Sequence, residues 1–170
     1  GKSTIEYTKY IFCYFLGENA QHRDFARVLS QKTGCKIITI PHCEKYNEVD
    51  ENFGDIPLSE VQPQDFLCLI KNAEYVCTDS FHGTVFSVIF GKKAAVFERF
   101  SNKEKGSTNS RIHSLLDMLN LRGAMMASSE DVDVFLNYEY DRNEVLRLLD
   151  AEREKSFAYL DKALGMTRKM

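Results

Sequence analysis

Short apolar runs alternate with polar turns and helical repeats along most of the chain. Runs rich in β-branched and aromatic residues predict strands, whereas apolar residues spaced three and four apart predict helices. The predicted strands cover residues 10–16, 36–40, 75–77 and 94–97. Helices are predicted up to Gly34, over about 64–72 and over 81–90. This alternation favours a parallel sheet with helices on both faces, so we predict a Rossmann-like α/β fold.

The remaining segments are predicted to complete the same domain, residues 1–170. The polar stretch 42–55 lacks an apolar period and is expected to be a surface loop, and 101–108 is expected to be a mobile polar segment. A helix capped by Asn109 and Ser110 should carry its apolar residues on one face. A last long helix is expected over about 141–164. Its predicted apolar stripe consists of Val145, Leu148, Leu149, Phe157 and Leu160.

The polar turn between the strand at Tyr75 and the following helix is the most informative motif. Thr78, Asp79 and Ser80 can cap that helix, which places His82 in its first turn. Ligands of open α/β sheets bind outside the carboxyl ends of the strands, and a helix N-terminus favours a phosphate or a carboxylate. The motif therefore predicts an anionic substrate.

Composition and charge narrow the classes of protein. A chain of 170 residues with 44% hydrophobic residues can form one domain with a substantial core. The net charge of −3 provides no basic surplus for nucleic acid. No apolar run approaches the roughly 20 residues of a membrane span, and the start does not resemble a signal peptide, so we expect a soluble cytoplasmic chain.

The cysteines and the missing nucleotide motifs exclude further classes. The five cysteines include no CxxC pair, so neither a disulfide framework nor a zinc site is expected. Cys13, Cys68 and Cys77 lie in apolar runs and are expected to be buried. Cys43, beside His42, is expected to be a loop thiol without function. Neither GxGxxG nor a Walker sequence is present, which argues against a dinucleotide or P-loop site.

The segment Thr78-Asp79-Ser80-Phe81-His82-Gly83-Thr84, with the apolar residues that follow it up to Gly91, resembles the polysaccharide pyruvyl transferase family. Asn109-Ser110-Arg111-Ile112 is also similar to that family, so the resemblance covers nearly the whole chain. It implies the carboxyl-terminal, donor-binding half of an enzyme similar in plan to GT-B glycosyltransferases. The chain is accordingly expected to be one domain of a two-domain enzyme, and inactive alone.

The resemblance implies transfer of a pyruvyl group from phosphoenolpyruvate to a sugar of a bacterial-type surface polysaccharide, such as an exopolysaccharide or a capsule. The product would be a cyclic pyruvate ketal, and neither a metal nor a cofactor is expected. A lipid-linked acceptor would place the enzyme at the inner face of the membrane. His82 is the implied acid/base, because histidine exchanges a proton near neutral pH. The implied donor-binding residues are Thr78, Asp79, Ser80, Phe81, Gly83, Thr84, Arg99 and Arg111.

One position departs from the family pattern. Many relatives have an arginine two residues before the histidine, where this chain has Ser80. Arg99 and Arg111 are the candidates to supply the missing charge, because a guanidinium can bind an oxyanion bidentately.

Other interpretations remain open from the sequence. The same helix N-terminus could hold the diphosphate of a nucleotide sugar in a glycosyltransferase, or the domain could be a non-catalytic module of a glycan-assembly complex. Asp79 and Ser80 serve equally well as helix caps, and Arg99 can pair with Glu98 on the surface. His113 is expected to be a solvated helix residue.

Overall fold

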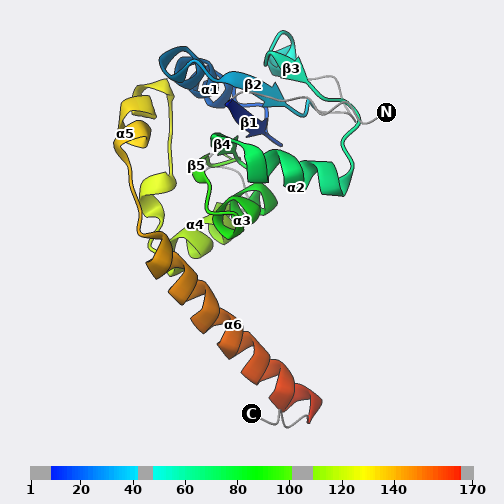
Figure 1. Ribbon diagram of the computed structural model, residues 1–170, viewed down its shortest axis with the longest axis vertical. Helices are drawn as coiled ribbons and strands as arrows, with labels where there is room; N and C mark the ends of the chain where they lie inside the picture. The colour runs from blue at the N-terminus through cyan, green and yellow to red at the C-terminus, as the bar shows by residue number, and fades with distance from the viewer. Residues whose placement is uncertain (1–8, 42–47, 101–108, 166–170) are drawn as a thin grey trace.

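A five-stranded parallel sheet forms the centre of the protein (Figure 1). The computed structural model describes residues 9–41, 48–100 and 109–165. In spatial order the strands are β3-β2-β1-β4-β5, and all pairs are parallel. Their bounds are β1 Tyr10–Tyr14, β2 Lys36–Thr39, β3 Ile56–Pro57, β4 Tyr75–Thr78 and β5 Lys93–Val96. The predicted Rossmann-like α/β fold is confirmed.

Six α-helices lie in the described ranges. They are α1 Ala20–Thr33, α2 Pro63–Asn72, α3 Phe81–Ile89, α4 Asn109–Met118, α5 Val132–Asn137 and α6 Arg142–Leu164. Their ends follow the local sequence: Asn19 caps α1 by accepting from the Gln21 amide, and Gly34 ends α1 at a positive φ of 73°. None of these helices combines the length and apolar character needed to cross a membrane.

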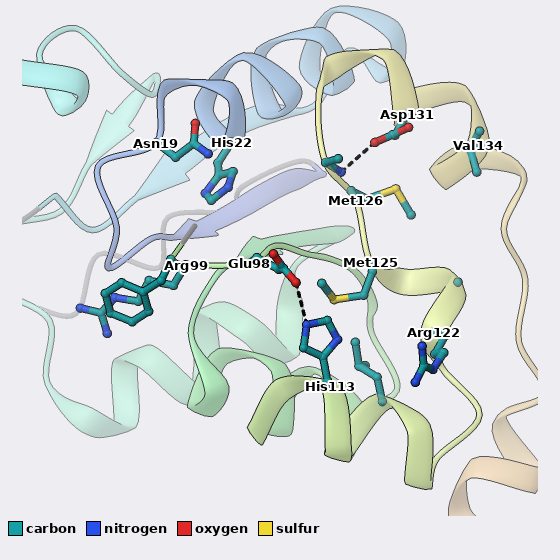
Figure 2. Close-up of a pocket in the computed structure, with 14 residues that line it drawn as sticks. Asn19, His22, Glu98, Arg99, His113, Arg122, Met125, Met126, Asp131 and Val134 are labelled. Atoms are coloured by element: carbon teal, nitrogen blue, oxygen red, sulfur yellow. Dashed lines mark hydrogen bonds and ion pairs between the residues drawn. The ribbon is translucent and has the colours of Figure 1, made fainter. Parts of the chain in front are cut away.

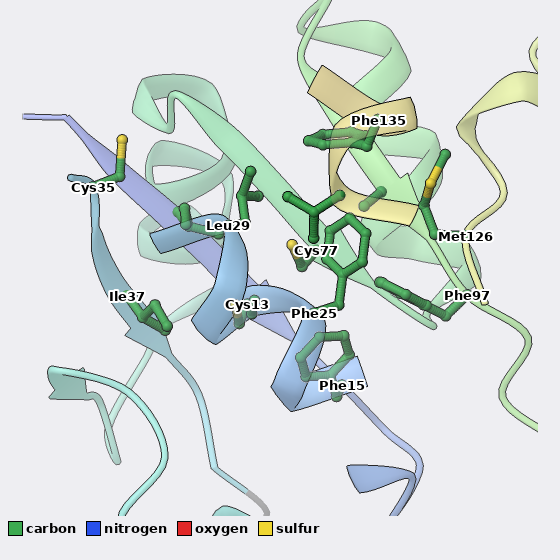
Figure 3. Close-up of a cluster of buried hydrophobic side chains, with 14 of the residues drawn as sticks. Cys13, Phe15, Phe25, Leu29, Cys35, Ile37, Cys77, Phe97, Met126 and Phe135 are labelled. Atoms are coloured by element: carbon green, nitrogen blue, oxygen red, sulfur yellow. The ribbon is translucent and has the colours of Figure 1, made fainter. Parts of the chain in front are cut away.

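Apolar side chains fill both faces of the sheet. On one face, α1 and α5 cover the centre of the sheet, where Phe25, Leu29 and Phe135 pack around Cys13 and Cys77 (Figure 3). On the other face, α2 and α3 pack against a second cluster, which contains Phe12, Ile38, Ile70 and Val76. Alternate residues of each strand thus face opposite layers, as expected for a sheet that is buried on both sides.

The last helix has one docked end and one projecting end. Val145 is buried against α4, and Leu148 and Leu149 pack beside it. Beyond this first part α6 extends away from the rest of the protein (Figure 1), and Leu160 is 48% exposed. The predicted bounds of the helix are correct, but its apolar stripe is buried only near the start, because no other described element accompanies its distal half.

The prediction of a surface loop over 42–55 was only partly correct. Within its described part a short 3₁₀ turn, Glu48–Asp50, precedes Phe53, which is buried. Directly after it, β3 pairs with β2 as a fifth strand where four were predicted. Pro57 is tolerated there because an edge strand does not need every backbone donor. Residues 42–47, with His42 and Cys43, and the segment 101–108 lie outside the described residues.

One helix was missed by the sequence analysis, and one cysteine was placed wrongly. The short helix α5 was not predicted, although its Phe135 is fully buried under the sheet. Cys68 was expected to be buried but is exposed, because the apolar face of α2 is carried by its neighbours Phe66, Leu69 and Ile70. Cys13 and Cys77 are buried as predicted.

Candidate functional site

The carboxyl ends of β1 and β4 meet at the point where the strand order reverses. The Asp79 carboxylate lies at this switch point, 1% exposed, and accepts hydrogen bonds from the amides of Leu16 (2.7 Å) and Gly17 (2.9 Å). Buried Arg23 holds the same loop from below, donating to the carbonyl oxygen of Gly17 at 2.8 Å. The loop after β1 is therefore fixed to the loop after β4, at the edge where α/β proteins bind ligands.

The turn between β4 and α3 is held by its own hydroxyl groups. Thr78 Oγ1 donates to the Tyr14 carbonyl oxygen (2.7 Å) and accepts from the Ser80 amide (3.1 Å). Ser80 Oγ accepts from the Gly83 amide at 3.3 Å, so the predicted helix cap is Ser80. Thr84 Oγ1 donates back to the Ser80 carbonyl oxygen at 2.9 Å. The side chains of Thr78, Asp79, Ser80 and Thr84 are all buried and hold the turn in place.

His82 and Phe81 are the motif residues that present side chains toward solvent. The His82 side chain is exposed, and its ring lies 5.9 Å from the Phe81 ring. The Phe81 ring also contacts Arg111: the guanidinium lies 5.3 Å from the ring centroid, which is within cation–π range. Phe81 and Arg111 line a shallow groove of about 340 Å³ together with Met118. The Phe81 ring thus contacts the Arg111 guanidinium and lies near the His82 ring, although His82 itself does not line the groove.

Two backbone donors lie in the first turn of α3. The first amides of a helix lack intrahelical partners, and here Ser80 satisfies those of Gly83 and Thr84. The amides of Phe81 and His82 remain at the positive end of the α3 dipole. This arrangement suits an anion.

Arg99 lies in a different place from Arg111. Its Nη2 donates to the Leu16 carbonyl oxygen at 3.3 Å, and its backbone amide donates to Asn109 Oδ1 at 3.1 Å. The side chain lines a separate cavity that Arg111 does not reach. The two arginines were predicted to act on one donor, but Arg99 lines this cavity and Arg111 lines the groove.

That separate cavity is the larger of the two, about 640 Å³. It lies between the carboxyl edge of the sheet, α4 and the segment that runs from Arg122 to Val134 (Figure 2). Its polar wall includes Asn19, His22, Glu98, Arg99, His113 and Arg122. We call it the β1–β5 cavity.

Two histidines in this cavity were not singled out by the sequence. His113 was expected to be a solvated helix residue, and its side chain is 40% exposed on α4; its Nε2 also lies 2.7 Å from Glu98 Oε1, and both residues line the cavity. His22 is 2% exposed, and its Nδ1 lies 3.6 Å from Asp79 Oδ2. A signal for His22 existed, because it occupies the first turn of the helix after a strand, as His82 does.

Burial and charge act on one tyrosine beside this edge. Burial, together with the nearby Asp79 carboxylate, raises the pKa of Tyr14, while Arg99 acts in the opposite direction. Tyr14 therefore stays a neutral phenol at the carboxyl end of β1. In the described part of the chain, no three His, Cys, Asp or Glu side chains gather in a way that could hold a metal ion.

Comparisons with known proteins identify the family of the chain. No curated protein sequence and no solved structure is significantly similar to the chain. The profile of the polysaccharide pyruvyl transferase family matches residues 2–102, which include the Thr78–Thr84 turn and Arg99, whereas Arg111 lies beyond the match. Because this match covers more than half of the sequence, the chain belongs to the polysaccharide pyruvyl transferase family.

Proposed function

We propose that this domain binds phosphoenolpyruvate at the N-terminus of α3 and takes part in forming a pyruvate ketal on a sugar of a surface polysaccharide precursor. The observation that supports this most strongly is the exposed His82 in the first turn of α3, next to Phe81, whose ring contacts the Arg111 guanidinium. A proton-transfer group and groups that can bind an anion thus both lie next to Phe81, at the N-terminus of α3.

The donor is a compact anion with a phosphate and a carboxylate. The amides of Phe81 and His82 would bind one anionic group, helped by the helix dipole. Arg111 would bind the other and so replace the arginine that many relatives have at the position of Ser80. Arg99 is tied to the Leu16 carbonyl oxygen, so in this proposal it adds positive charge at a distance instead of contacting the donor.

The proposed chemistry needs one acid and two sugar hydroxyls. His82 would protonate the CH₂ carbon of the enol, which leaves an oxocarbenium-like carbon that the first hydroxyl attacks. The carbon–oxygen bond to phosphate then breaks, and the second hydroxyl closes the ketal ring. Each hydroxyl loses its proton, so the products are the ketal and inorganic phosphate. Positive charge beside the departing phosphate would stabilise this step.

The acceptor would be presented by the second domain that the two-domain plan implies. Orienting two reactants in one cleft contributes up to roughly 7–11 kcal/mol of the barrier. The chain by itself is therefore expected to bind the donor but not to catalyse transfer. The proposed location is the cytoplasm, at the inner face of the membrane when the acceptor is carried on a lipid.

Titration of phosphoenolpyruvate into the ¹⁵N-labelled chain at fixed ionic strength tests the donor site. Amide shifts should saturate at 81–84 and near Arg111, and should be larger than those caused by inorganic phosphate. His82→Ala and Arg111→Gln should weaken binding, whereas Arg153→Gln, on the projecting part of α6, should not. A UDP-sugar producing these shifts in place of phosphoenolpyruvate would favour the glycosyltransferase alternative. Absence of any localised anion shift would favour the non-catalytic module.

A further inference from the structure

The β1–β5 cavity is separate from the groove beside Arg111 and has a different chemistry. We propose that it binds a sugar unit of the polysaccharide, with His22 and His113 accepting hydrogen bonds from sugar hydroxyls. The proposal rests on the proposed function for the polysaccharide, whereas the walls that would hold the sugar come from this chain alone. Its volume of about 640 Å³ falls in the range of small-molecule sites.

The charged groups of the cavity are already committed to partners inside the protein. Arg122 pairs with Asp117, and Arg99 donates to the Leu16 carbonyl oxygen. Asp131 Oδ2 accepts from the amides of Ala127 (2.7 Å) and Ser128 (3.0 Å). Arg122 is paired with a carboxylate, whereas Arg99 and Asp131 are bonded to neutral backbone groups, so these side chains are held in place and can orient a polar ligand.

Apolar surface alternates with these polar groups. Phe100, Met125 and Met126 line the same cavity as Asn19 and His113. A sugar ring has the matching pattern, since its C–H faces are apolar while its hydroxyls both donate and accept hydrogen bonds. Such a mixture of apolar lining and a few polar groups fixes the orientation of a ligand.

His22 supplies a buried polar group without a partner. Its ring stacks on Phe97 at a centroid distance of 4.5 Å and lies 5.7 Å from Phe15. Within the described residues Nδ1 has no hydrogen-bond partner, and the nearest carboxylate oxygen, on Asp79, is 3.6 Å away. The negative charge of Asp79 favours the proton on Nδ1, which leaves Nε2 as the acceptor of a ring that lines the cavity (Figure 2).

His113 repeats this arrangement from another element. It comes from α4, and its Nε2 is held by Glu98 at 2.7 Å (Figure 2). The other ring nitrogen stays available to a hydroxyl. Two histidines, each beside a carboxylate and carried by different helices, therefore face one cavity. This juxtaposition is the basis for assigning the cavity to a ligand rich in hydroxyls.

Methionine methyl groups report separately on the β1–β5 cavity and on the groove beside Arg111. Met125 and Met126 line the β1–β5 cavity, whereas Met118 lines the groove beside Arg111. Methyl glycosides of glucose, galactose, mannose and their N-acetylated amino sugars would be titrated into chain labelled with ¹³C at the methionine methyls. Titrations should reach about 50 mM, so that binding with a dissociation constant in the millimolar range approaches saturation.

We expect at least one glycoside to shift Met125 and Met126 saturably and to leave Met118 unchanged. His113→Ala and Glu98→Gln should weaken that binding by about 2- to 10-fold, the loss expected for one hydrogen bond. Asp24→Asn, on the exposed face of α1, is the matched carboxylate control and should bind as the original chain does.

Two results would overturn the proposal. One is the absence of any Met125 or Met126 shift with every glycoside, since all the lining residues are present in this chain. The other is a larger shift of these methyls with phosphoenolpyruvate than with any glycoside, which would move the donor into this cavity. If phosphoenolpyruvate does not shift Met118 while a glycoside still shifts Met125 and Met126, the result counts against the donor site and not against the sugar site.

Discussion

Gly83 lies so close to Thr78 that a Cβ atom on the glycine would stand 2.5 Å from Thr78 Oγ1. The same hydroxyl donates to the Tyr14 carbonyl oxygen and accepts from the Ser80 amide, so it cannot move aside without losing both bonds. Close packing of α3 on β4 at this point therefore determines where the first turn of α3, and with it His82, stands relative to the sheet.

Gly83→Ala should destabilise the domain by about 1–3 kcal/mol, the range of overpacked substitutions. Urea unfolding followed by circular dichroism measures this loss. In a double-mutant cycle, Thr78→Ala should relieve part of the clash, so the two losses should sum to more than the loss in the double variant. Strict additivity would contradict the close contact.

Asp79 should matter more for stability than an ordinary surface aspartate. Asp79→Asn replaces an acceptor with two charged oxygens by one with a single carbonyl oxygen, so one of the buried amides of Leu16 and Gly17 loses its partner. An unsatisfied buried donor costs about 1–3 kcal/mol. Thermal unfolding of the variant measures this cost, and Asp24→Asn, at an exposed position, should stay within about 0.5 kcal/mol. Equal stability of the two variants would show that the switch-point bonds contribute little.

Much of the fold could be predicted because its signals are local. The strand at Tyr75, the polar turn and the helix from Phe81 follow one another directly, and Ser80 caps the helix as its sequence position suggests. By contrast, β3 has two residues and exists through pairing with β2, a contact that no local pattern encodes. The burial of α5 likewise depends on a distant partner, α1, whose Phe25 contacts Phe135.

The candidate site was predictable to the same extent. His82 stands out because a strand, a turn and a cap surround it in the sequence. His22 gains its significance from Asp79, which meets it because β1 and β4 are neighbours in the sheet. His113 gains its significance from Glu98, which meets it because α4 packs beside the end of β5. Arg99 and Arg111 are equivalent in the sequence because both follow β5. In the structure Arg99 donates to Leu16 and lines the β1–β5 cavity, whereas Arg111 contacts Phe81 and lines the separate groove.

Cysteine reactivity should separate sharply by position. Burial, followed by the neighbouring Cys77, raises the pKa of the Cys13 thiol well above its ordinary value of 9.0. Burial also keeps the reagent away from Cys13 and Cys77, so both should resist iodoacetamide in the folded chain while exposed Cys68 reacts. Peptide mapping by mass spectrometry after a timed reaction identifies the modified positions. Rapid labelling of Cys13 without denaturant would contradict its burial.

The same raised pKa gives a dependence of stability on pH. An unfolded Cys13 ionises above pH 9.0, whereas the folded thiol holds its proton to higher pH. The folded state then binds more protons, so this contribution to stability is complete below pH 9.0 and is lost as the pH rises further. Urea midpoints measured on either side of pH 9.0 should fall with pH, and Cys13→Ala should make that fall shallower. An unchanged slope in Cys13→Ala would mean that other groups cause it.

The two ends of α6 should respond differently to the same kind of substitution. Val145 is 4% exposed and packs in the cluster with Ile112 and Leu116, so Val145→Ala should cost about 1–3 kcal/mol. Leu160 lies on the projecting end at 48% exposure, and Leu160→Ala should change stability by less than about 0.5 kcal/mol. Alanine has a higher helix propensity than valine and leucine, so helix propensity alone would not predict a loss in either variant. Equal losses in urea unfolding would mean that the distal half of α6 is covered in solution, by a second copy of the chain or by another part of it, and sedimentation of the Leu160→Ala variant would distinguish these two cases.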